Sequence, residues 1–597
     1  MDGLTAALEP GEHFHTDLIA RLAQEFFREG KGAPDPAAVS PSVPTAAAGL
    51  PSTGSTPVPS SAPGFSDPTP DNDLHGGFPS AQTGHAAPPV HPSMVSDDTP
   101  ASAKPAPGSG FPNLGGGSQG DRHFETERSS RNVAPSHHRD SGLPGLDHAA
   151  TEPQLYYLEG IREQSPKSTA PQDHNSISPF SFGYREFAPS FTGFDIEGVR
   201  RDFPALHQRV HGHPLIWLDN AATTQKPQAV LDATSSFYGN DNSNIHRAAH
   251  TLAERSTKLF EAGREKVRQF LGASDKKEIV FVRGTTEAIN LVAQSYGRQH
   301  IGAGDEILLS QIEHHANIVP WQILANQVGA NIRVIPIDDR GELLLETLPS
   351  LLTERTKIVS VTHVSNSLGT INPVEIIIQA AHARGIPVLV DGAQSTPHMP
   401  INVTALDADF YVFSGHKVFG PTGIGALYGK AHHLESMPPW QGGGHMIKDV
   451  TFEKTVYNHV PEKFEAGTPD IAGVVGLAAA IDYIMGIGIP SLAAYEHGLL
   501  EYATEAMRGI PGIRPIGTAR NKASVLGFVI PGITNERIAD HLDHQGIAVR
   551  AGHHCALPSL RHFGVESTVR PSLAFYNTHA EVDALVNALY QLVRRLS

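Results

Sequence analysis

The chain has 597 residues, a formal net charge of -17 and one cysteine, Cys555. A single cysteine excludes an intramolecular disulfide and a zinc site built from several cysteines, and a reducing, cytoplasmic location is expected. The negative charge argues against a nucleic-acid binder, which needs a basic face to neutralise phosphates. Because the amino terminus lacks the features of a signal peptide and no run of about 18 apolar residues could span a bilayer, we expect no export and no membrane insertion.

The amino-terminal third divides into a short helix and a long extension. Within residues 1–31, Leu18, Leu22 and Phe26 recur at helical spacing, which predicts an amphipathic helix. Residues 32–190 are dominated by Pro, Ser, Gly, Thr, Ala and His. Such a segment cannot bury enough apolar area to offset its ordering entropy, so we expect it to be disordered.

Three apolar islands interrupt the extension, at 142–146, 155–158 and 180–184. They either pack on the surface of the same chain or act as linear docking motifs that fold onto a partner. The sequence leaves both readings open.

From about residue 191 the pattern is that of an ordered enzyme body. Short apolar runs alternate with longer segments of helical periodicity, which is typical of a mostly parallel sheet covered on both faces. We expect a large domain over about 215–470 and a smaller one over about 471–597 plus 194–214. The predicted strands of the large domain cover 278–282, 306–310, 332–336, 358–361, 388–390 and 410–413.

Polar groups follow three of these predicted strands. Thr285 and Thr286 come after the first, at the start of a helix, where they could hold a phosphate or simply cap the helix. Asp391 follows a later strand, at the sheet edge where open α/β folds bind ligands. Lys417 follows the next strand and precedes a glycine-rich turn, where partial desolvation would suit a Schiff-base amine.

Cys555 lies in the segment Arg550-Ala-Gly-His-His-Cys, between predicted strand and helix. Cationic neighbours favour the thiolate, so Cys555 is a candidate nucleophile. His553 and His554 could suggest a metal, but adjacent residues rarely chelate one ion, and we expect no metal site.

The order of threonines, aspartate and lysine resembles that of pyridoxal-phosphate (PLP) enzymes of fold type I. Over about 194–597 the chain is similar to class V aminotransferases, specifically to group II cysteine desulfurases of the SufS kind. The resemblance implies an α/β large domain with a mixed, mostly parallel sheet and a smaller carboxy-terminal α+β domain. The long extension is similar to that of cysteine desulfurases carried as cargo by family 2 encapsulin shells.

The resemblance also implies roles for individual residues. Lys417 would bind the cofactor covalently, Asp391 would pair with its ring nitrogen and His314 would stack on its ring. The other implied cofactor ligands are Thr285, Thr286, Asn366, Gln394, Ser414, His416 and Thr468, the last lent across a homodimer interface. The implied substrate ligands are Arg570, which would grip the carboxylate, together with Asn366, Arg550, His246 and Arg247. Gln441 departs from the glutamate that close relatives often carry.

The implied reaction converts L-cysteine to L-alanine and leaves the sulfur on Cys555 as a persulfide, for iron–sulfur cluster assembly or storage. With no second cysteine in the chain, the sulfur must pass to a SufE- or SufU-like protein or to a small thiol. Selenocysteine lyase activity is the nearest enzymatic alternative. In a different class, the chain would be an assembly component whose role is set by residues 1–190, through which it enters an encapsulin shell.

Overall fold

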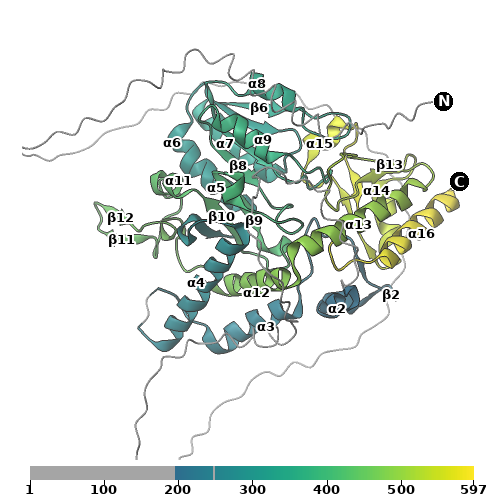
Figure 1. The fold of residues 1–597 in the computed structure, drawn as a ribbon, viewed down its shortest axis with the longest axis horizontal. Coiled ribbons are helices and arrows are strands. Elements are labelled where there is room, and N and C mark those ends of the chain that lie inside the picture. The colour runs from purple at the N-terminus through teal and green to yellow at the C-terminus, as the bar shows by residue number, and fades with distance from the viewer. Residues whose placement is uncertain (1–194, 247–248, 597) are drawn as a thin grey trace, which may run out of the picture. The chain divides into compact units, whose positions relative to one another are not determined.

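The computed structural model describes residues 195–596, except 247–248. The predicted amino-terminal helix, the extension with its apolar islands and Arg247 lie outside the described residues. The described residues form a large domain around a seven-stranded sheet and a smaller domain that contains the carboxy-terminal helices (Figure 1).

The central sheet has the strand order β4-β10-β9-β8-β7-β5-β6. The neighbouring pairs from β9 to β6 are parallel, whereas β10 runs antiparallel to both β4 and β9. This confirms the expected mixed, mostly parallel sheet, and each predicted strand is found with small shifts at its ends. The strands are β4 (Ile279–Val282), β5 (Glu306–Ser310), β6 (Asn331–Ile335), β7 (Thr356–Thr362), β8 (Val388–Asp391), β9 (Phe410–Ser414) and β10 (Gly425–Gly429).

Both faces of the sheet are covered, because successive residues of a strand point to opposite faces. In β9, Phe410 and Val412 join one core, and Tyr411 and Phe413 join the other. The first core receives α5 (Thr285–Val292), α7 (Val319–Val328) and α11 (Ala431–Ser436). The second receives α3 (Gln228–Ser236), α4 (Thr251–Leu271), α9 (Val374–His382) and α12 (Ile471–Ile487).

The small domain is built on a short antiparallel sheet of order β13-β14-β17-β16. Its helices pack around a separate apolar core that includes Leu499, Ile538 and Leu589. The elements are α13 (Ile489–Arg508), β13 (Arg514–Pro515), β14 (Phe528–Val529), α14 (Asn535–Asp543), β16 (Arg550–Gly552), α15 (Leu557–His562), β17 (Thr568–Arg570) and α16 (His579–Leu596).

A parallel pair joins the start of the described chain to this domain, because β3 (Ile216–Trp217) pairs with β15 (Ile547–Ala548). The hairpin of β11 (Ile447–Val450) and β12 (Thr455–Tyr457) projects on the side of the molecule away from α16 (Figure 1). The remaining elements are α2 (Ile196–Arg201), β1 (Arg209–Val210), β2 (His213–Pro214), α6 (Arg298–His300), α8 (Leu348–Leu351) and α10 (Val403–Leu406).

Within the described part of the chain, no single helix is long and apolar enough to cross a bilayer. The helices α12 and α13 pass that test only as a pair, across a bend of 76°.

Candidate active site

The carboxyl ends of β4, β5, β7, β8 and β9 meet at one edge of the sheet, since these strands run in the same direction. Ligands of open α/β folds bind at this edge. The loops that leave it carry most of the predicted site residues: Thr285, His314, Asn366, Asp391, Ser414 and Lys417.

Lys417 ends a single 3-10 turn, Gly415–Lys417, that directly follows β9. The backbone before it is held by the carbonyl of His416, which accepts hydrogen bonds from the hydroxyl of Thr223 at 3.0 Å and the amide of Thr224 at 3.1 Å. Burial is the main reason that the pKa of Lys417 falls to about 8. A substantial share of its amine is therefore neutral near physiological pH, as a Schiff-base amine or a general base requires.

Four charged groups act on Lys417 as well. Asp391 and Cys555 oppose the fall of its pKa, while Arg570 and Arg550 add to it. Charged side chains of both domains therefore lie close enough to the lysine amine to change its pKa.

Asp391 is the last residue of β8 and is 3% exposed. Its Oδ1 accepts a hydrogen bond from the amide of Ala393 at 2.9 Å. Burial raises the pKa of Asp391, and the charge of Lys417 offsets only part of this. A buried carboxyl with a raised pKa is stabilised when a cation is placed against it.

His314 caps the 3-10 turn His315–Asn317, and its Nδ1 accepts a hydrogen bond from the amide of Ala316 at 3.0 Å. Burial, followed by the charge of Lys417, lowers the pKa of His314 to about 3. The ring is thus neutral, with its proton on Nε2.

The sequence analysis missed Glu313, which anchors this loop. The fully buried carboxyl of Glu313 accepts hydrogen bonds from Nδ2 of Asn317 at 2.7 Å and from the amide of Thr362 at 2.9 Å. Burial raises the pKa of Glu313 to about 8. Glu313 could have been noticed in the sequence because it is a charged residue directly before His314.

A polar cradle lies at the start of α5. The Ser414 hydroxyl accepts a hydrogen bond from the amide of Thr285 at 2.9 Å and donates to the hydroxyl of Thr285 at 2.9 Å. Gly284, with φ of 152°, precedes it, and a Cβ there would lie 3.0 Å from Ser414 Oγ. The exposed Thr286 follows in the first turn, where amides have no acceptor within the helix.

Two further predicted cofactor ligands flank this centre. The buried side chain of Gln394 donates a hydrogen bond to the carbonyl of Ala221 at 2.6 Å. Burial, followed by the charge of Lys417, lowers the pKa of His416 to about 4, so its ring is neutral.

Arg570 is 1% exposed and its guanidinium is only partly satisfied. Nη2 donates to Oδ1 of Asp219 at 3.0 Å and Nη1 donates to the carbonyl of Asn366 at 2.8 Å. Its Nε and the Oδ1 of Asn366 are buried without a partner. Because buried polar atoms are normally satisfied, this pair indicates a place for a polar ligand.

Asp219 is a second residue that the sequence analysis missed, although it stands beside Asn220 two residues after β3. Its Oδ2 accepts a hydrogen bond from Nε of Arg550 at 3.1 Å, so one carboxylate bridges Arg550 and Arg570. The pairing of β3 with β15 brings Asp219 to the small domain.

The segment that carries Cys555 is held against the large domain. The amide nitrogen Nδ2 of Asn366 donates to the carbonyl of His554 at 2.7 Å, and the amide of His315 donates to the carbonyl of Cys555 at 2.7 Å. His554 and Cys555 have φ of 51° and 54°, a left-handed conformation that is uncommon outside glycine. The backbone around the half-buried Cys555 is therefore fixed rather than free to swing.

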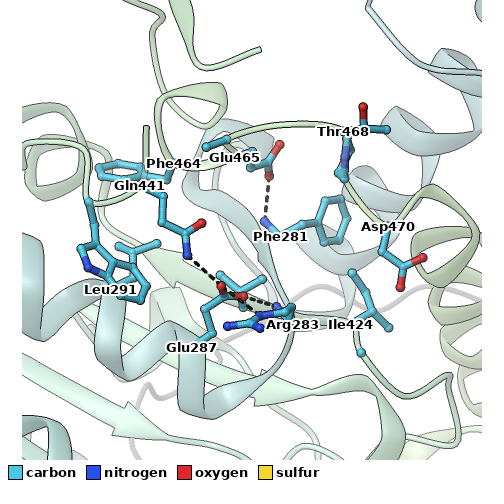
Figure 2. Close-up of a pocket in the computed structure, with 15 residues that line it drawn as sticks. Phe281, Arg283, Glu287, Leu291, Ile424, Gln441, Phe464, Glu465, Thr468 and Asp470 are labelled. Carbon is cyan, nitrogen blue, oxygen red and sulfur yellow. Dashed lines mark hydrogen bonds and ion pairs between the residues drawn. The ribbon is translucent and has the colours of Figure 1, made fainter. Parts of the chain in front are cut away.

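Thr468 is not placed with Lys417 in this chain. Its hydroxyl accepts a hydrogen bond from Asn244 at 3.2 Å, and it lines a pocket of about 560 Å³ beside the first turn of α5 (Figure 2). In the same pocket Gln441 donates to Glu287 at 3.1 Å (Figure 2). The predicted role of Thr468 across a dimer interface stays a prediction.

His246 contacts α4 and a second histidine instead of the residues around Lys417. Its Nε2 lies 3.3 Å from Glu261, and its ring stacks on that of His445 at 4.7 Å. Its role toward the substrate stays a prediction, and Arg247 lies outside the described residues.

These residues fit PLP. A buried carboxyl with a raised pKa suits a protonated ring nitrogen, a neutral histidine suits the ring face, and the hydroxyls at a helix start suit a phosphate. The unsatisfied Nε of Arg570, a donor, suits an amino-acid carboxylate, whereas the unsatisfied Oδ1 of Asn366, an acceptor, suits a donor such as an amino group.

Comparisons with known proteins also indicate a PLP-dependent enzyme. Residues 216–585 match the class-V aminotransferase family. The chain is 60% identical over 400 residues to a cysteine desulfurase of Synechococcus elongatus, covering 67% of this chain and 64% of that relative. It is 56% identical to a probable cysteine desulfurase of Mycolicibacterium paratuberculosis over 68% of this chain and 59% of that relative. It is 49% identical to a cysteine desulfurase of Escherichia coli over 68% of this chain and 99% of that relative.

The chain thus spans less than two thirds of the S. elongatus and M. paratuberculosis relatives. Among solved structures, the cysteine desulfurase CsdA of E. coli superposes with a TM-score of 0.63 at 43% identity, over 68% of this chain and 99% of that one. The apo cysteine desulfurase of Thermococcus onnurineus superposes with a TM-score of 0.64 at 39% identity, over 67% of this chain and 98% of that one.

Proposed function

Because this chain belongs to the class V aminotransferases, and within them to the cysteine desulfurases, we propose that it converts L-cysteine to L-alanine and takes the sulfur onto Cys555. The observation that carries the proposal is the position of Cys555. A thiolate there acts electrostatically on Lys417, and the backbone of the segment is fastened to the loops that carry His314 and Asn366.

When bound, PLP supplies an electron sink for negative charge at the substrate Cα. The residues that would hold it are Lys417, Asp391, His314, Gln394, Thr285, Thr286, Ser414 and His416.

Arg570 would bind the carboxylate of L-cysteine through its planar guanidinium, with the substrate satisfying the unpartnered Nε. Asn366 would accept a hydrogen bond from the α-amino group of the arriving substrate through its unpartnered Oδ1. With the substrate oriented in this way, the neutral amine of Lys417 takes the proton from Cα at its Nζ.

Cys555 then acts as the nucleophile. Its thiolate attacks the substrate sulfur, so an S–S bond forms while the Cβ–S bond breaks and its electron pair stays on carbon, which is protonated. The net change is L-cysteine plus the Cys555 thiol giving L-alanine plus the Cys555 persulfide.

The sulfur must then leave the chain, since no second cysteine is available to resolve the persulfide. The fixed backbone around Cys555 favours delivery to an acceptor that comes to it, either a SufE- or SufU-like protein or a small thiol. We expect slow turnover without such an acceptor, and a homodimer in which Thr468 serves the neighbouring site.

The test compares the holoenzyme with Cys555→Ala and Lys417→Ala on L-cysteine and on L-selenocysteine. Cys555→Ala should abolish alanine formation from L-cysteine, and Lys417→Ala should abolish the visible absorption of the bound cofactor as well as both reactions. Cys555→Ala that retains cysteine turnover contradicts the proposal. Efficient selenocysteine cleavage by a parent enzyme that is inert toward L-cysteine favours the lyase alternative.

We further propose that residues 1–190 direct the enzyme into an encapsulin shell. The support is compositional, together with the fact that the match to the S. elongatus relative leaves about a third of both proteins unaligned. Co-expression of a family 2 shell protein with the full chain and with a variant lacking residues 1–190 tests this. Undiminished encapsulation of the shortened variant contradicts it.

A further inference from the structure

Two histidines from different domains stand beside Cys555. His315 follows β5 in the large domain, whereas His553 belongs to the segment after β16. One ring nitrogen of each histidine and the sulfur of Cys555 all lie within 4.8 Å of one another. The two rings are 5.7 Å apart between centroids and tilted by 30°.

The hydrogen bonds of the two rings fix their tautomers. The amide of Cys555 donates to Nδ1 of His553 at 3.0 Å, and the amide of Leu557 donates to Nε2 of His315 at 3.3 Å. A nitrogen that accepts an amide proton carries a lone pair, so each ring turns an unprotonated nitrogen toward the cysteine segment, Nδ1 in His553 and Nε2 in His315. Neutral imidazole nitrogens and a thiolate are the ligands that zinc uses in proteins.

We propose that His315, His553 and Cys555 form a binding site for a zinc ion, with one sulfur and two nitrogen ligands. Three protein ligands leave one position of a tetrahedral zinc open, and His553 is exposed, so water can fill it. Binding converts the thiol and the ion into a zinc thiolate and releases one proton. The ion replaces the contacts that the amides of Leu557 and Cys555 make to these two ring nitrogens.

This differs from the expectation of no metal site, which considered only the three neighbouring residues His553, His554 and Cys555. The ring of His554 is turned away, because its Nε2 lies 2.8 Å from the hydroxyl of Thr568. The third ligand comes instead from His315, far away in the sequence, whose backbone amide is already bonded to Cys555.

Zinc on Cys555 would occupy the lone pair that attacks the substrate sulfur. Bound zinc is therefore a reversible block on sulfur acceptance, a consequence that rests on the proposed function, whereas the binding itself does not. A chelator should restore the activity of a zinc-treated enzyme in full.

Equilibrium dialysis of the full-length holoenzyme against zinc, with metal content measured by elemental analysis, tests the site. The chain has 33 histidines, so the quantity of interest is the difference between variants. The parent should bind one equivalent more than Cys555→Ser, and His315→Gln and His553→Ala should each weaken that equivalent at least about tenfold. His562→Ala, which removes an exposed histidine of α15 outside the cluster, is the matched control and should bind like the parent.

X-ray absorption at the zinc edge gives a second readout, with one sulfur and two imidazole ligands expected for the parent and no sulfur for Cys555→Ser. Equal zinc content in the parent and Cys555→Ser overturns the site. Undiminished affinity in both His315→Gln and His553→Ala also overturns it, because the ion would then rest on the thiol alone. The proposed function is tested separately, because it fails if the metal-free holoenzyme forms no alanine from L-cysteine.

Discussion

Two buried aspartates stand at opposite edges of the central sheet, one at the end of β8 and one just before the neighbouring strand β9. Asp409 precedes β9 at the amino edge, where His382, His433 and Lys430 all contact its carboxylate within 3.2 Å. Asp391 ends β8 at the carboxyl edge, where no ion pair forms with it among the described residues. The two aspartates are buried to a similar degree, but Asp409 is paired with basic side chains whereas Asp391 has no ion-pair partner among the described residues.

Their ionisation follows this difference. Burial raises the pKa of Asp409, but hydrogen bonds from His433 and His382, an amide and the charge of Lys430 outweigh it and hold the pKa well below its ordinary value. The pKa of Asp391 is raised by burial without such compensation. A paired buried charge supports the fold, whereas an unpaired one at the ligand-binding edge is kept for a partner outside the chain.

Asp391→Asn should give the largest effect, on activity alone. Without the carboxylate, the ring nitrogen of the cofactor loses its counter-charge, and kcat for alanine formation should fall roughly 10²- to 10³-fold. The free energy of unfolding of the cofactor-free protein should change by less than about 1 kcal/mol, because no ion pair is lost. Steady-state kinetics and denaturant unfolding measure the two quantities. If Asp391→Asn lost stability but kept its kcat, Asp391 would serve the fold and not the cofactor, contrary to this prediction.

Asp409→Asn should do the opposite. The substitution removes the buried carboxylate that His382, His433 and Lys430 share and leaves only the exposed Asp407 beside His382 and Lys430, so the free energy of unfolding should fall by about 2–4 kcal/mol at neutral pH. Activity at a temperature where the variant is folded should match that of the parent, since no residue of the candidate site contacts Asp409. A kinetic defect in the folded variant would show that the two edges are coupled.

The stability difference between the parent and Asp409→Asn should also depend on pH. The folded-state pKa of Asp409 lies below its ordinary value of 3.8, so its contribution is fully present above that value and is lost as pH falls through the folded pKa. The gap in unfolding free energy should therefore be constant from neutral pH to about pH 5 and shrink below about pH 4. Urea unfolding at several pH values measures it. A gap that stays constant to pH 3 contradicts the assigned pairing.

The contrast between the two edges also explains how much the sequence could predict. Asp391 and Lys417 each follow an apolar run directly, and parallel strands bring their carboxyl ends to one edge, so local pattern was sufficient. The antiparallel strand β10 was missed because it begins and ends in glycine, which weakens a strand pattern.

Contacts between distant segments could not be predicted in this way. Asp219 reaches Arg570 because β3 pairs with β15 and Asp219 itself bridges Ser572, and His315 reaches Cys555 because the small domain packs on the loop after β5. No spacing in the sequence encodes either approach. The sequence around Cys555 indicated a reactive cysteine, but it could not indicate that His315 lies beside it.

Asn366→Ala should give the smallest effect and shows how the carboxyl edge holds the nucleophile. Its Nδ2 donates to the carbonyl of His554, so removal of the side chain frees one of two anchors of the cysteine segment. Single-turnover persulfide formation should slow by about tenfold, because the substrate contact and the anchor are both lost. Alkylation of Cys555 by iodoacetamide in the absence of substrate reports the anchor alone and should accelerate by about threefold as the segment opens. Asn372→Ala is the matched control, since Asn372 also donates to a backbone carbonyl, that of Thr362, but does not contact the cysteine segment. Unchanged alkylation in Asn366→Ala would mean that the anchor at His315 and the left-handed backbone hold Cys555 without help from the edge of the sheet.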